Sequence, residues 1–88
     1  MVNSENMKED ILEIQDKYND EISGTKLETI LRLALTAALD PDDEDMLELV
    51  KMRVEQEKSD LKVIALEKLE KKGYDLFTKI ILQLGLTL

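Results

Sequence analysis

Apolar residues recur along the first quarter of the chain at alternating spacings of four and three residues. Five side chains follow this rule: Met7, Ile11, Ile14, Tyr18 and Ile22. Such spacing places them on one face of an α-helix and leaves the charged residues between them in solvent. We therefore predict a helix from Ser4 to about Glu21, ended by the break at Ser23 and Gly24.

A second helix is predicted from Thr25 to Leu39. Thr25 and Glu28 have the spacing of a capping box, in which each side chain satisfies a free backbone donor at the helix start. Beyond Glu28 the segment has only three polar residues: Thr29, Arg32 and Thr36. A helix that is apolar on nearly every side is buried on most of them, so we expect this helix to lie in the core and to contact a second subunit.

The third helix is predicted to begin with Asp40 as its N-cap and Pro41 at its first position, where the missing N–H costs nothing. The acidic residues 42–45 would then lie at the positive end of the helix dipole. These features predict a helix start at the most acidic point of the chain.

Residues 55–60 carry no apolar side chain, which leaves two structures open. Either one long helix runs from Pro41 to about Lys72, or Ser59 caps a separate helix after a break. The gap has no glycine or proline, which favours the continuous helix. At about 1.5 Å per residue this helix would be about 48 Å long and would overhang a bundle of 88 residues.

The last helix is predicted from about Asp75 to Leu84. Lys71 and Lys72 before Gly73 have the order typical of a helix C-terminus. The C-terminal residues 84–88 are apolar, and an apolar terminus is usually tied down. The whole pattern predicts one all-α domain over residues 1–88, a bundle of four helices with a long third helix, or five if the chain breaks at Ser59, and a frayed start at residues 1–4.

Self-association is also predicted. A chain of 88 residues removes only about 60% of its unfolded surface from water on folding, and its second and fourth helices carry more apolar surface than the remaining segments can cover. We expect a homodimer with five interface side chains: Leu31, Leu35, Phe77, Ile81 and Leu84.

Charge and missing residue types exclude several functions. The chain has 20 acidic and 12 basic residues, a net charge of −8, which disfavours direct binding to nucleic acid. It has no Cys and no His, so disulfides, thiolate chemistry and the usual catalytic triad are excluded. No apolar run reaches the roughly 18 residues of a membrane span, and the acidic start is unlike a signal peptide. We expect a cytoplasmic protein without a membrane span.

The densest carboxylate group does not form a calcium loop. Its members are Asp40, Asp42, Asp43, Glu44, Asp45 and Glu48. In such a loop, Asp45 would stand where the turn needs glycine, and Lys51 where a bidentate glutamate belongs. We expect a solvated helix start, with no metal and no cofactor.

Two acidic pairs at i and i+3, Asp45 with Glu48 and Glu57 with Asp60, give a resemblance to a known enzyme family. They are similar in outline to the paired motifs of all-α nucleotide pyrophosphatases of the MazG type. The resemblance implies magnesium-dependent hydrolysis, provided that a helix break lets the two pairs face each other.

Our main hypothesis is a non-enzymatic interaction protein, a small regulator, inhibitor or adaptor that binds a basic surface of another protein. The predicted acidic face consists of Asp42, Asp43, Asp45 and Glu48, although surface acidity also serves solubility. Alternatives are a DNA mimic, a phage-type inhibitor, a structural subunit of a larger assembly, or the pyrophosphatase. In size and layout, and in the segment 18–23, the chain also resembles helical bacteriocin-immunity proteins.

Overall fold

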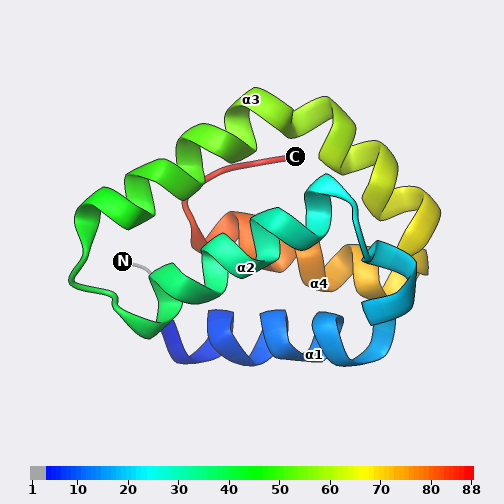
Figure 1. The fold of residues 1–88 in the computed structure, drawn as a ribbon, viewed down its shortest axis with the longest axis horizontal. Coiled ribbons are helices and arrows are strands. Elements are labelled where there is room, and N and C mark those ends of the chain that lie inside the picture. The colour runs from blue at the N-terminus through cyan, green and yellow to red at the C-terminus, as the bar shows by residue number, and fades with distance from the viewer. Residues whose placement is uncertain (1–3) are drawn as a thin grey trace.

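Four α-helices make up the computed structural model, which describes residues 4–88. They are α1 (Ser4–Ile22), α2 (Lys26–Leu39), α3 (Glu44–Lys68) and α4 (Glu70–Gln83). In Figure 1, α1 lies along one edge of the molecule, α3 arches over the opposite edge, and α2 and α4 lie between them. The all-α prediction is confirmed. Ser4 is helical, and the other positions expected to fray, residues 1–3, lie outside the described residues.

The core forms where the apolar faces of all four helices meet. α2 packs against α1 and α3, and α4 also packs against α1 and α3. Large side chains from every helix are fully buried there, among them Ile11, Leu31, Leu61 and Phe77. Each such side chain contributes about 1.5–3 kcal/mol when it leaves water. The amphipathic patterns of the sequence therefore converge on one core.

The turn between α1 and α2 confirms Thr25 as the N-cap of α2. The Thr25 hydroxyl accepts a hydrogen bond from the backbone N–H of Glu28 at 3.4 Å. The Glu28 carboxylate reaches one residue earlier than expected and accepts from the N–H of Gly24 at 3.3 Å. It does so because the N–H of Thr25 already donates to the carbonyl of Ile22.

The third helix begins later than the sequence predicts. Asp43, not Asp40, is its N-cap, and the Asp43 carboxylate accepts from the N–H of Met46 at 3.0 Å. Asp40 instead ends α2, and its carbonyl accepts from the N–H of Asp43 across a tight turn. Pro41 takes the second position of this turn, which its fixed φ suits as well as a first helical position.

This boundary makes a testable difference between two neighbouring aspartates. Asp43→Ala should lower the free energy of unfolding by about 1 kcal/mol, the usual cost of removing a helix cap. Asp40→Ala removes the same charge from the same turn and should leave stability unchanged. Urea unfolding followed by circular dichroism measures both. Equal losses in the two variants would mean that charge, rather than the cap, sets the effect.

The helix α3 is continuous through residues 55–60, as the absence of Gly and Pro favoured. Its 25 residues are fewer than the sequence pattern predicts, and the molecule extends 32 Å along its longest principal axis. Figure 1 shows the helix arching with its concave side toward the core. Long helices commonly curve around a core in this way. The expected overhang is thus wrong.

The corner between α3 and α4 also differs from the prediction. α3 ends at Lys68, Leu69 lies between the helices, and Glu70 adopts a positive φ of 54°. Gly73, predicted to end the third helix, instead lies buried inside α4. A Cβ atom there would come within 2.8 Å of both the Leu69 Cβ and the Tyr18 ring. Glycine is needed at this position for close packing, not for a helix end.

The apolar C-terminus is tied down, as expected. Gly85 has a φ of 84° and donates to the carbonyl of Leu82, and Leu86 donates to the carbonyl of Ile81. These two bonds form a Schellman motif, which ends α4. Leu86 and Leu88 then pack against the core as partly buried side chains, and Figure 1 shows this segment turning back toward the middle of the molecule.

Candidate functional site

The predicted dimer contacts lie inside the single chain. Of the five side chains proposed for the interface, four are fully buried in the core: Leu31, Phe77, Ile81 and Leu84. Leu35 is partly buried and packs against the same core. A second copy cannot contact these four residues while the fold is intact. A homodimer stays a prediction, and it would have to use other residues.

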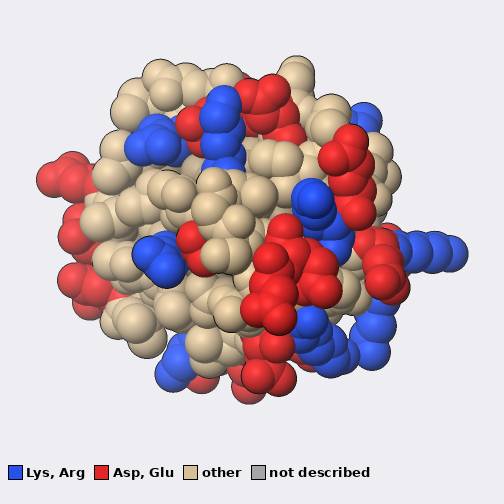
Figure 2. Space-filling view, turned by 45° about the vertical axis from the view of Figure 1, so that its right-hand side comes forward, with Lys and Arg blue, Asp and Glu red and all other residues tan. Residues whose placement is uncertain are grey.

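The predicted acidic face lies in solvent at one end of the molecule. Asp42, Asp43, Asp45 and Glu48 are all exposed, as are Asp40, which follows α2, and Glu44, the first residue of α3. Figure 2 shows acidic side chains projecting from the left edge, where this turn lies. Among the described residues, none of these six carboxylates takes part in an ion pair. The predicted exposure of this group is confirmed, but Asp43 caps α3 where Asp40 was expected. The role of the group in binding a partner stays a prediction.

An apolar side chain lies beside the exposed carboxylates of residues 40–48, which we call the acidic end. Leu39, the last residue of α2, is 61% exposed and directly precedes Asp40. Leu39 therefore offers apolar contact area next to unneutralised charge. Sequence reasoning missed Leu39 as a surface residue because it expected the second helix to be buried on most of its sides.

The two acidic pairs that resemble pyrophosphatase motifs do not face each other. Both pairs lie on the unbroken helix α3, and both carboxylates of the second pair form ion pairs with basic side chains. Asp60 pairs with Lys26, and Glu57 pairs with Arg53. Within residues 4–88, no group of three or more Asp, Glu, His or Cys side chains is arranged to hold a metal ion. The helix break that the resemblance requires is not present.

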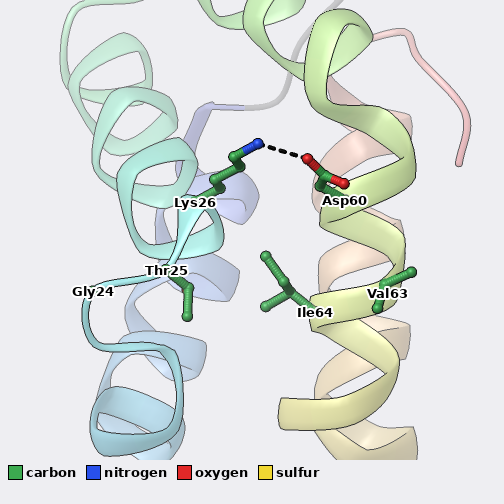
Figure 3. A pocket seen from close by; sticks show the side chains of 6 residues that line it. All are labelled: Gly24, Thr25, Lys26, Asp60, Val63 and Ile64. Atoms are coloured by element: carbon green, nitrogen blue, oxygen red, sulfur yellow. Dashed lines mark hydrogen bonds and ion pairs between the residues drawn. The ribbon is translucent and has the colours of Figure 1, made fainter.

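A shallow groove lies between the start of α2 and the second half of α3. It has a volume of 390 Å³ and is lined by Gly24, Thr25, Lys26, Asp60, Val63 and Ile64. Figure 3 shows Lys26 reaching across to Asp60, with a distance of 2.6 Å between the Nζ and Oδ2 atoms. This hydrogen bond raises the pKa of Lys26 above its ordinary value. The contact holds α2 to α3, and no sequence signal links residues that are 34 positions apart.

Polar side chains also join α1 to α4. Asp10 is nearly buried, and its carboxylate accepts from the amide of Gln83 at 3.1 Å and pairs with Lys79 at 3.5 Å. These contacts fix the packing of α1 on α4.

The outer face of α3 carries a second apolar stripe that the sequence analysis did not recognise. Leu49, Met52, Val63 and Leu66 are 36–57% exposed. With Gln56 and Ser59 they repeat at alternating intervals of three and four residues. The signal was available in the sequence, but Val50, Val54 and Leu61 form a competing stripe on the opposite side, and that stripe was taken as the only apolar face.

Comparisons with protein-family models, with curated proteins and with solved structures found no match for this chain. None of the helices in the described part of the chain is long and apolar enough to cross a membrane. The interpretation of function therefore depends on the exposed surfaces of the molecule.

Proposed function

We propose that this protein acts by binding another protein, and that the acidic end of the molecule makes the contact. The observation that supports the proposal is the group of six exposed carboxylates between Asp40 and Glu48, which has no neutralising Lys or Arg among the described residues. A surface of one sign of charge speeds encounter with a partner of opposite sign. The partner offers a basic surface.

The exposed Leu39 supports recognition over a role in solubility alone. Solubility needs charge, but it does not need an exposed leucine beside the charge. At an interface, a leucine of this kind supplies apolar contact area and the surrounding carboxylates supply specificity. The combination fits a regulator, inhibitor or adaptor without catalytic activity.

The test uses a variant in which three carboxylates of the acidic end are neutralised: Asp42→Asn, Asp45→Asn and Glu48→Gln. Asp43 is kept because it caps α3. Wild-type protein is immobilised, its partner is captured from a lysate of the source organism and identified by mass spectrometry, and binding of the purified partner is measured by calorimetry. Because exposed ion pairs contribute about 0.2–1 kcal/mol each, we expect the variant to bind about tenfold more weakly.

The matched control neutralises three exposed carboxylates of α1: Asp16→Asn, Asp20→Asn and Glu21→Gln. Both variants change the net charge from −8 to −5, so only the position of the charge differs. The control should bind as wild type does. Equal weakening in both variants would show that net charge, not the acidic end, attracts the partner.

A further inference from the structure

The stripe on the outer face of α3 has the spacing of a helix-pairing seam. Its six positions follow the three-and-four repeat with which two helices pack along each other: Leu49, Met52, Gln56, Ser59, Val63 and Leu66. All six are exposed, and the core face of α3 lies on the opposite side. Four of the seven large apolar side chains that the described residues expose belong to this stripe. Within residues 4–88 the stripe is therefore unpartnered.

The stripe has nearly the same pattern from either end. Two apolar residues stand at each end, and the polar pair Gln56 and Ser59 stands in the middle. If two copies of α3 pack antiparallel about a two-fold axis between residues 57 and 58, Met52 of each copy lies opposite Val63 of the other. Gln56 then lies opposite Ser59. Every apolar position meets an apolar position, which is what an isologous contact requires.

The charges beside the seam favour this antiparallel arrangement. Glu55 and Lys62 flank one side, are both exposed, and take part in no ion pair within the described chain. In the antiparallel register, Glu55 of each copy lies within one helical turn of Lys62 of the other copy. The two-fold axis makes this pair occur twice. On the other side Arg53 lies within one turn of Asp60 of the other copy, but each of these residues already pairs within its own chain, Arg53 with Glu57 and Asp60 with Lys26. A parallel pair would bring opposite charges together at Glu48 with Arg53 and at Lys62 with Glu67, but it would also bring Glu55 next to Asp60, where like charges repel. The antiparallel register has no such repulsion.

The curvature of α3 limits the contact to the middle of the stripe. The convex side of the helix faces outward (Figure 1), so two copies touch best near residues 52–63 and diverge toward Leu49 and Leu66. This middle section is where the opposite charges meet. An interface of this length lies at the small end of specific protein contacts, and a reversible dimer is expected.

From the spacing, the exposure and the charge complementarity, we propose that the outer face of α3 binds a second copy of this chain in antiparallel orientation. This contact does not use the acidic end, so it can fail without affecting the proposed binding of a partner protein.

The first experiment measures the oligomeric state by sedimentation equilibrium at protein concentrations up to about 1 mM, the range of weak complexes. Wild type should show a monomer–dimer equilibrium. Val63→Asp should remain helical by circular dichroism, because the side chain is exposed, and should be monomeric. Leu82→Asp, at an equally exposed leucine on α4, should dimerise as wild type does. A wild type that is monomeric throughout, or a loss of the dimer in both variants, would overturn the proposal.

The second experiment tests the orientation and uses the absence of cysteine in the native chain. Met52→Cys and Val63→Cys proteins are mixed and oxidised gently. The antiparallel register predicts a disulfide between the two different variants. It predicts no disulfide between two Met52→Cys chains. In this register their cysteines are offset by eleven residues along the helix axis, which is about 16 Å at about 1.5 Å per residue. A disulfide needs Cα atoms within roughly 7 Å of each other. A linked Met52→Cys homodimer would show parallel pairing and overturn the proposal.

Discussion

Replacing Ile81 with aspartate should unfold the chain rather than separate two subunits. Ile81 is fully buried in the core of the single molecule, where a carboxylate would find neither water nor a cation. An unpaired buried charge costs several kcal/mol, and a domain of this size has about 5–15 kcal/mol of stability in total. We expect the helical circular dichroism signal to be lost, or the unfolding midpoint in urea to fall sharply.

The neighbouring residue provides the control. Leu82→Asp introduces the same charge one position further along α4, where the side chain is 58% exposed, and it should change stability by less than about 0.5 kcal/mol. Leu35→Asp, at a partly buried position, should lie between the two. If Ile81→Asp gave a stable, folded monomer, then Ile81 would be an interface residue, as the sequence first suggested, and not a core residue.

The apolar faces of the helices could be predicted from the sequence. Whether another helix of the same chain or a second subunit packs against each face could not. α2 is apolar on nearly every side because α1 packs on one flank and α3 on another. From the sequence, the same pattern fits equally well a helix that contacts a second subunit. The curved path of α3 decides between the two, and a hydrophobic pattern specifies the inner face of a helix but not its curvature.

The ends of the elements were harder to predict where several residues could perform the same role. Between positions 40 and 43 three aspartates compete to cap the helix, and Pro41 suits both a turn and a first helical position. Only the hydrogen bond from Met46 to Asp43 separates these alternatives. The acidic end itself was predicted correctly because runs of carboxylates are seldom buried. The Lys26–Asp60 contact had no local signal.

Gly73 gives the sharpest test of how α1, α3 and α4 meet. In an ordinary helix interior, alanine is about 1 kcal/mol more favourable than glycine, so Gly73→Ala would stabilise the protein if only helix propensity mattered. In this structure the new Cβ would lie 2.8 Å from the Leu69 Cβ and 2.8 Å from the Cε2 atom of Tyr18. The Leu69 Cβ is attached directly to the backbone of the corner and cannot turn away.

We therefore expect Gly73→Ala to destabilise the protein by a net of up to about 2 kcal/mol, because overpacking typically costs about 1–3 kcal/mol and the gain in helix propensity is only about 1 kcal/mol. Urea unfolding measures the effect. Lys71→Ala, at an exposed position of the same helix, controls for helix propensity and should be close to neutral. Adding Tyr18→Ala tests the contact directly: Gly73→Ala should cost less in that background, because the clash with the ring is gone while the clash with Leu69 remains. If Gly73→Ala stabilised the protein instead, the corner would be looser than the structure shows, and α4 would have room for a side chain against α1.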